Sequence, residues 1–332
     1  MYGNRLKKKC SFNREVKKPL RKYVFLSLSL VFFILLIGFS YEKLGEYKDS
    51  KNYPFIGEMV EVNNHKINLF SKGEGDNTVV FCSGHNSPSA YAEFYPLYNE
   101  ISNYAKVVTY DRPGHGWSEI TDTPRDIDSI AHEMHDVFEK SGQKSPYILV
   151  GHSYASLQVI RFAQLYKDEV SGIVLIDGGN PEFYAKNGLE TSKSTEYSYK
   201  FLKSVGLARL VLNHTNYYSK NLKLLPNNLK ELDLSMTIKT LYNKNIIDEG
   251  NLAKASAKIV LENGHLGDLP IKIVTDPDND EWISSQEALK EWSTNSEQVS
   301  VDGAGHSIYQ TNPDIINKEI LKLIENNSQK NN

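Results

Sequence analysis

Cysteine is scarce in this chain, which has two cysteines among 332 residues. Cys10 lies in a basic N-terminal segment and Cys82 in a predicted strand, so the chain beyond the basic segment cannot form an internal disulfide. This argues against a disulfide-stapled secreted scaffold. The 21 glycines and 12 prolines are too few for a collagen-like or low-complexity chain. The length and the globular composition suit one large α/β domain or two small ones.

Two further patterns are missing, and both concern cofactors. No glycine-rich phosphate-binding loop follows the first buried strand, so a nucleotide cofactor is not expected. His132 and His135 are three residues apart on a predicted helix, whereas the zinc-protease pattern needs a spacing of four. No third ligand is visible in the sequence. We therefore expect neither a metal nor a cofactor.

Long apolar runs are also absent, with one exception. Tyr23–Tyr41 has nineteen residues and no charge. As a helix it would span roughly 28 Å, which is close to the hydrocarbon thickness of a bilayer. The 22 residues before it carry nine Lys or Arg and one acid, a net charge of +8, which leaves −11 for the rest of the chain. The overall charge of −3 therefore describes neither part.

The apolar run has two interpretations. A cleaved signal peptide needs a small-residue cleavage site, and Gly38-Phe39-Ser40 resembles one. An uncleaved signal anchor over residues 23–41 fits the length better and is preferred. In both cases the positive-inside rule keeps residues 1–22 in the cytoplasm and sends the rest across the cell membrane. The basic tail is thus a topology signal, and no nucleic-acid partner is expected.

The remaining sequence divides into a stalk and one domain. Residues 42–57 are polar with Gly and Pro, and are interpreted as a stalk. Over residues 58–328, apolar β-branched runs alternate with helical periods, which predicts a mostly parallel, doubly wound sheet covered on both faces. The predicted strands are Met59–Val62, Lys66–Phe70, Thr78–Cys82, Lys106–Tyr110, Tyr147–Val150, Gly172–Ile176, Ile271–Thr275 and Gln298–Val301. The predicted helices are Ala90–Asn103, Asp126–Ser141, Tyr154–Tyr166, Ser284–Trp292 and Pro313–Glu325.

One long segment interrupts this alternation. Residues 180–266 contain helical periods and many Tyr, Leu and Lys residues, with no convincing strand. The segment is too long for a simple loop in a compact domain. We interpret it as a helical lid inserted between two strands of the sheet.

A serine stands between a predicted strand and a predicted helix. The sequence Gly151-His152-Ser153-Tyr154-Ala155 follows a buried strand and opens a helix. This is the context of a nucleophile elbow, in which a sharp turn lifts a serine hydroxyl above the sheet. Small residues are needed on both sides of the serine, and Ala155 takes a place that is often glycine. Ser153 is therefore the candidate nucleophile.

A serine nucleophile needs a base and an oxyanion hole. His306, in Val301-Asp-Gly-Ala-Gly-His306-Ser after the last predicted strand, is the candidate base, and the order Ser before His fits this architecture. The oxyanion donors are expected to be the backbone N–H of Tyr154 and that of His85, in the loop after an early strand.

These residues carry a family resemblance. Together with Tyr110-Asp-Arg-Pro-Gly-His-Gly-Trp-Ser118, they make the chain from about Asn63 to Glu325 resemble the α/β-hydrolase fold superfamily. It is most similar to the lipase/esterase- and aminopeptidase-like branch. Dehalogenases and epoxide hydrolases of this fold use an aspartate as nucleophile, whereas position 153 is serine.

The resemblance leaves two places for the catalytic acid. The first is the loop after the penultimate strand, which offers Asp276, Asp278 and Asp280 outside the customary Gly-x-x-Asp frame. The second, used by some members, lies two strands earlier at Asp177. Because the segment around Trp282 resembles a branch whose loop often lacks a well-placed acid, Asp177 is favoured and the loop aspartates stay open.

The sequence thus predicts a membrane-anchored serine hydrolase with a Ser153–His306–Asp177 triad. Its partner would be a small or medium, largely apolar ester or amide substrate. If that substrate carries an amine, as for an aminopeptidase, Glu182 or Glu190 of the lid could hold it. The alternative function is a non-catalytic surface binding module of the same fold.

Overall fold

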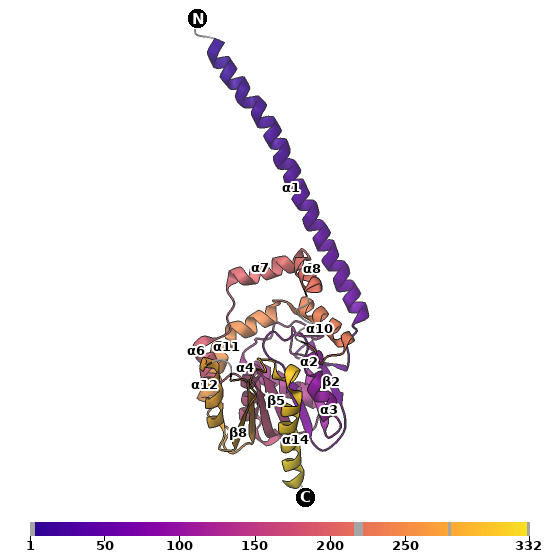
Figure 1. Ribbon diagram of the computed structural model, residues 1–332, viewed down its shortest axis with the longest axis vertical. Helices are drawn as coiled ribbons and strands as arrows, with labels where there is room; N and C mark the ends of the chain where they lie inside the picture. Colours follow the sequence, from indigo (N-terminus) through magenta and orange to yellow (C-terminus); the bar gives the residue numbers. More distant parts are fainter. Residues whose placement is uncertain (1–3, 216–221, 278–279, 331–332) are drawn as a thin grey trace.

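The chain folds around one eight-stranded sheet, with a long helix extending from it (Figure 1). The computed structural model describes residues 4–215, 222–277 and 280–330. The strand order is β1-β2-β4-β3-β5-β6-β7-β8; β1 and β2 pair antiparallel with their neighbours, and every other pair is parallel. The strands are β1 (Glu58–Val62), β2 (His65–Lys72), β3 (Thr78–Cys82), β4 (Lys106–Tyr110), β5 (Tyr147–His152), β6 (Val170–Ile176), β7 (Ile271–Thr275) and β8 (Ser296–Ser300).

The strands form where the apolar runs predict them. All residues of β3, β5 and β7 are buried, as expected for parallel strands covered on both faces. The hairpin between β1 and β2 turns at Asn63 and Asn64, which both have positive φ, a conformation that asparagine tolerates. The predicted mostly parallel sheet is therefore confirmed.

Helices cover both faces of the sheet. α4 (Ile127–Lys140) and α5 (Ala155–Leu165) pack into the apolar core on one face. The short helices α2 (Ala90–Glu93), α3 (Tyr95–Ile101) and α13 (Ile308–Thr311), together with α14 (Pro313–Lys330), pack on the other. The single helix expected over 90–103 is divided at Phe94, just before the proline near the start of α3. After β7, α12 (Asp280–Ala288) continues as a 3₁₀ turn, Leu289–Trp292.

The long insertion between β6 and β7 consists of helices and the turns and loops that join them, and contains no strand among its described residues. It contributes α6 (Pro181–Asn187), α7 (Lys193–Ser204), α8 (Leu207–His214), α10 (Asn227–Thr240) and α11 (Lys244–Glu262). α11 packs against α4, α5 and α6. In Figure 1 the insertion lies over one edge of the sheet, with α7 and α8 farthest from the strands.

The N-terminal helix is longer than the apolar run. α1 spans Asn4–Asn52, so most of the segment interpreted as a stalk is a continuation of this helix. Residues Arg21–Asn52 are long and apolar enough to cross a membrane, a property that signal sequences share. The lower part of α1 also touches the insertion, because Arg209 of α8 donates to Glu42 and Asp49. Residues 42–52 of the predicted stalk are therefore helical and packed on α8.

Candidate active site

The turn between β5 and α5 places Ser153 at the edge of the sheet. Ser153 has a φ of 53°, the left-handed conformation that marks a strained nucleophile turn. Its backbone N–H donates to the Ile176 carbonyl at 3.1 Å, which ties the turn to the end of β6. A Cβ on Gly151 would lie 3.0 Å from the Ala155 carbonyl oxygen. The strand and the helix therefore approach too closely for a larger residue at position 151.

The predicted serine, histidine and aspartate lie in one chain of contacts. Ser153 Oγ is 2.9 Å from His306 Nε2, and His306 Nδ1 is 2.5 Å from Asp177 Oδ2. Asp177 is buried and also accepts a hydrogen bond from Trp282 Nε1 at 3.0 Å. An aspartate placed in this way orients the imidazole and stabilises its protonated form. The geometry matches that of a nucleophile, a base and an orienting acid.

The loop aspartates occupy other positions. Asp276 is buried, and its carboxylate accepts from the backbone N–H of Gly305, next to His306. It thus holds the histidine loop, while Asp177 contacts the histidine ring. Asp278 lies outside the described residues, and so does the side chain of Asp280.

A second histidine and a buried glutamate support the loop that carries His306. His152 Nε2 is 3.1 Å from the backbone oxygen of His306, and the two ring centroids are 4.7 Å apart. His152 Nδ1 lies 3.3 Å from Glu93, which also accepts from Tyr309 and Ser87. Burial by itself raises the pKa of Glu93, but the contact with His152 and these hydrogen bonds outweigh it and lower the pKa. Glu93 is therefore a buried carboxylate whose charge is stabilised by donors.

The loop after β3 lies against the serine, where an oxyanion hole is expected. A Cβ on Gly84 would lie 3.2 Å from the Cβ of Ser153. Among the described residues, the backbone N–H groups of His85 and Tyr154 have no hydrogen-bond acceptor. Two free donors beside a nucleophile are suited to stabilising a developing oxyanion.

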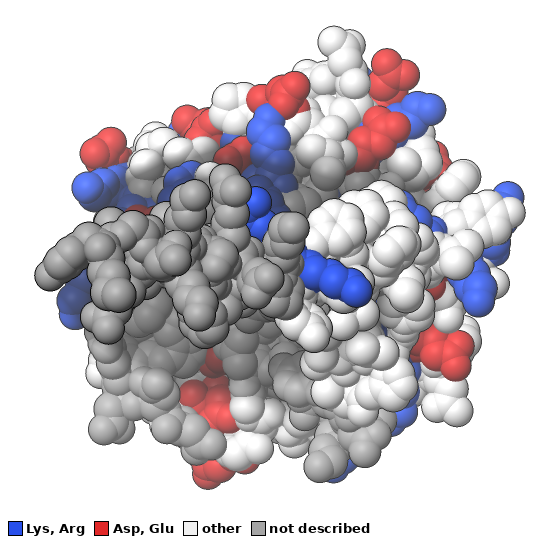
Figure 2. Space-filling model, turned by 90° about the horizontal axis from the view of Figure 1, so that it is seen from above, with Lys and Arg blue, Asp and Glu red and all other residues white. Residues whose placement is uncertain are grey.

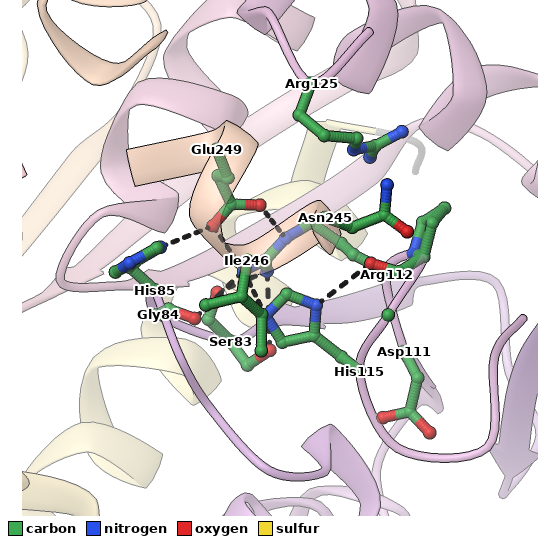
Figure 3. Close-up of polar contacts among 12 residues, drawn as sticks. Ser83, Gly84, His85, Asp111, Arg112, His115, Arg125, Asn245, Ile246 and Glu249 are labelled. Atoms are coloured by element: carbon green, nitrogen blue, oxygen red, sulfur yellow. Dashed lines mark hydrogen bonds and ion pairs between the residues drawn. The ribbon is translucent and has the colours of Figure 1, made fainter. Parts of the chain in front are cut away.

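A buried ion pair connects this loop to the insertion (Figure 3). Arg112, after β4, donates to the carbonyls of Ser83 at 2.6 Å and Gly84 at 2.9 Å. The same guanidinium contacts both carboxylate oxygens of Glu249 on α11 at 3.0 Å. Glu249 in turn lies 3.1 Å from Nδ1 of the His85 ring. One helix of the insertion therefore helps to hold in place the loop after β3, residues 83–85, which is the candidate oxyanion loop.

The electrostatics of this network are those of a permanent ion pair. Burial raises the pKa of Glu249, but Arg112 and His85 outweigh it, so that the pKa lies far below its ordinary range. Burial together with the Arg112 charge lowers the pKa of His115 to about 3, so His115 is neutral at physiological pH. Arg112 and Glu249 thus form a pair of opposite charges that stays ionised across the physiological pH range.

Two cavities meet at Ser153 and His306. One, of about 420 Å³, has aromatic and aliphatic walls from Phe183, Tyr184, Leu189 and Trp282. The other, of about 750 Å³, contains His85, His152 and two buried acids, Glu93 and Asp233. Burial, reinforced by the charge of Glu93, raises the pKa of Asp233 to about 8. Neither Glu182 nor Glu190, the acids expected in the lid, lines these cavities.

Several site residues were not identified from the sequence. Arg112 and His152 belong to the motifs quoted for the family, but the motifs alone do not give their roles. Glu93, Asp233 and Glu249 had no local signal, because each reaches the site only through packing of distant elements. His132 and His135 lie away from these contacts, with His132 bonded to Tyr166 and His135 to Glu169.

Comparisons with known proteins agree with the fold. The pattern of the alpha/beta hydrolase fold family matches residues 77–265. The uncharacterized protein YbdG of Bacillus subtilis is 32% identical over 192 residues, which are 57% of this chain and 59% of that relative. The chain therefore matches less than two thirds of the length of this relative.

Solved structures are similar at the level of the fold. A meta-cleavage product hydrolase (CumD) of Pseudomonas fluorescens has a TM-score of 0.61 and 17% identity, over 82% of this chain and 98% of that one. A putative lipase of Acinetobacter baumannii has a TM-score of 0.61 and 15% identity, over 86% and 97% of the two chains. Since the family pattern covers more than half of the sequence and the sheet has the matching architecture, this chain belongs to the alpha/beta hydrolase fold family.

Proposed function

We propose that this protein is a membrane-anchored serine hydrolase that cleaves an ester or amide bond through an acyl-enzyme. The observation that carries the proposal is the continuous contact from Ser153 Oγ through the His306 ring to the buried Asp177. Family membership supports a hydrolase in general. The serine mechanism and the substrate go further and rest on this geometry.

The residues support a two-step reaction. Ser153 Oγ attacks the carbonyl carbon of the substrate while His306 Nε2 takes its proton, and Asp177 stabilises the resulting imidazolium. The N–H groups of His85 and Tyr154 hold the oxyanion of the tetrahedral intermediate. His306 then returns the proton to the leaving group. Water, activated by the same histidine, releases the acid and restores Ser153.

The aromatic cavity supports a substrate with a largely apolar group. Its walls bring Phe183 and Leu189 of the insertion segment and Trp282 next to Ser153. A volume of about 420 Å³ suits a small or medium group. In this arrangement the insertion acts as a lid, which closes over an apolar group and excludes water from it.

One observation favours a second candidate within the same chemistry, an amine-bearing substrate. Asp233 lies in the larger cavity, and among the described residues no hydrogen-bond donor contacts its carboxyl group. A substrate ammonium group would supply the missing partner and lower the pKa of Asp233. An aminoacyl ester or anilide meets this requirement, and a neutral acyl ester does not.

Residues 23–41 are proposed to anchor the enzyme as an uncleaved span. The run has no charge, most of its exposed side chains are apolar, and the +8 segment before it favours a cytoplasmic N-terminus. Cleavage after Ser40 would remove Gly38, whose backbone packs directly on Val205 of the insertion. This contact supports an anchor that remains part of the enzyme.

Covalent labelling with a fluorophosphonate probe tests the catalytic proposal. We expect purified full-length protein to be labelled and Ser153→Ala to remain unlabelled. A panel of neutral acyl esters and aminoacyl anilides then separates the two substrate classes. Absence of labelling, or equal labelling of Ser153→Ala, would contradict the enzyme proposal and favour the non-catalytic binding module.

A further inference from the structure

α7 and α8 expose an apolar face that no described part of the chain covers. The face consists of Tyr197, Phe201, Leu207, Leu210 and Val211, which are between 42% and 67% exposed. Tyr197 and Phe201 are one helical turn apart on α7, and the other three share one side of α8. An exposed apolar cluster of this kind marks a surface that contacts a partner or a membrane.

The contact between α1 and the α7–α8 turn determines where the apolar face lies along the proposed span. The carbonyl of Val205, at the turn between α7 and α8, occupies the position that a Cβ of residue 38 would take. Gly206 adopts a φ of 69° and approaches the backbone of Gly38 equally closely. Two glycines therefore bring the α7–α8 turn into direct contact with the backbone of α1.

A buried ionic contact continues the same face of α1. Glu42 and Asp49, which are one and three turns beyond Gly38, both accept from Arg209 of α8 at distances of 2.7–3.1 Å. Glu42 and Arg209 are 2% and 5% exposed. Buried charges of this kind are paired in one geometry, because leaving either unpaired is costly. The position of α8 relative to α1 is therefore well defined.

In the proposed anchor, this position is the boundary between lipid and water. Gly38 is three residues from Tyr41, where the uncharged run ends, and Glu42 is the first charge after it. At about 1.5 Å per residue, the α7–α8 turn lies within about 5 Å of the end of the span. Figure 1 shows α7 and α8 between the sheet and the N-terminal half of α1, on the side that would face the bilayer.

The charges around the face fit the same location. Lys193 and Lys200 lie beside Tyr197 and Phe201 on α7, with exposed amino groups that pair with Glu196. Lysines beside an apolar face are typical of helices that lie in the headgroup region. In the described part of this side of the molecule, Figure 2 shows uncharged side chains and several Lys or Arg toward the middle, with most Asp and Glu around the rim.

We propose that the α7–α8 face is a membrane-docking surface, which inserts its five apolar side chains into the outer leaflet beside α1. The inference rests on the proposed anchoring of α1. The docking places the insertion between the bilayer and Ser153. The helical lid over the proposed active site would then be in contact with lipid.

Site-directed fluorescence in lipid tests the docking. The full-length protein carries Cys10→Ser and either Phe201→Cys or Leu210→Cys, and the new cysteine is labelled with the fluorophore NBD. The buried Cys82 is left in place. Each variant is reconstituted in nanodiscs with one copy per disc, with or without nitroxide-labelled phosphatidylcholine. We expect a blue-shifted emission and quenching of more than twofold at both positions. Retained fluorophosphonate labelling shows that each variant is folded.

Two reference positions make the outcomes distinct. Tyr104 is 56% exposed in the loop before β4, at the opposite edge of the sheet, and a label there should not be quenched. A label at Phe33, in the middle of the run, reports insertion of α1. If the label at Phe33 is quenched while the labels at Phe201 and Leu210 are quenched no more than the label at Tyr104, the docking is overturned and the anchor stands. If the labels at Phe201 and Leu210 are protected from quenching by aqueous iodide and are also not quenched by the nitroxide lipid, the face contacts protein, and the docking proposal is overturned as well. No quenching at Phe33 overturns the anchor and the docking together.

Discussion

At the scale of single residues, two buried aspartates have opposite surroundings. Asp177 is bonded to His306, Trp282 and the backbone N–H of Asp276, so its carboxylate has several donors. Asp233 has no donor among the described residues, and its pKa is raised to about 8 by burial and by Glu93. The first arrangement holds the carboxylate in the position from which it orients the His306 ring. The second favours a neutral acid that a cationic substrate or a rise in pH would ionise.

Asp177→Asn is expected to lower kcat by about 10⁴-fold, the size of the effect when a triad aspartate loses its charge. Asp276→Asn should cost about tenfold at most, because an amide oxygen can still accept from Gly305. Steady-state kinetics with one chromogenic ester compares the two variants. A turnover of Asp177→Asn near the wild-type value would show that the acid lies elsewhere.

Asp233 predicts a stability that falls as pH rises. The unfolded carboxyl group titrates near pH 4, whereas in the folded protein the pKa is raised to about 8. Between these values the folded state holds a proton that the unfolded state has lost, so each rise in pH favours unfolding. Asp233→Asn removes this contribution.

Thermal melting at pH 4.5 and pH 8 measures the effect. The Tm of Asp233→Asn minus the Tm of the wild type should increase with pH. Only the wild-type protein has the Asp233 carboxyl group, whose raised pKa makes folding less favourable as the pH rises. A difference in Tm that stays constant over this range would contradict the raised pKa.

At the scale of elements, prediction from the sequence succeeds where structure is local. β3, β4 and β7 begin and end at the predicted residues because buried β-branched runs favour strands. The motifs also placed Ser153, His306 and Asp177 at strand ends, where parallel strands bring them to one edge. The helical state of residues 42–52 was missed, because a polar sequence with Gly45 gives no local sign that its face packs on Arg209. Glu249 was missed for a related reason, since α11 reaches the oxyanion loop only through the tertiary fold.

The link between α11 and the oxyanion loop predicts the effect of Glu249→Gln. The amide keeps the size of the side chain but leaves the Arg112 charge buried and uncompensated, which is expected to cost about 3 kcal/mol of stability. Because Arg112 and His85 hold the donor loop, kcat should fall by about 10²-fold while KM changes little. Kinetics and thermal melting of the same preparation separate the two effects. Glu262→Gln, at the exposed end of α11, is the matched control. A fall in Tm with unchanged kcat would reduce Glu249 to a structural role.

At the scale of the whole molecule, the charge distribution and the fold agree with the proposed orientation of the chain in a membrane. The +8 segment precedes the span, and the −11 remainder carries the site. The ion pairs of Arg209 join the end of the span to the insertion, and the ion pair of Glu249 joins the insertion to the oxyanion loop. The insertion is therefore held by ion pairs at two places, at the end of the proposed span and at the loop after β3 that lies against Ser153.

The proposed orientation predicts that the N-terminal tail is inside the cell and the domain with Ser153 is outside. Two membrane-impermeant reagents can test this in the same cells. Cys10 lies within the basic segment and Ser153 beyond the span. In intact cells that express the full chain, an impermeant fluorophosphonate should label Ser153, and an impermeant maleimide should leave Cys10 unlabelled until the cells are permeabilised. Cys82 is buried and should not react in either case, which Cys10→Ser verifies. Neutral replacements of Lys7, Lys8 and Lys9 should raise the fraction of inverted molecules, because the difference in charge across the span decreases. Labelling of Cys10 from outside intact cells would mean that the tail, and not the catalytic domain, crosses the membrane.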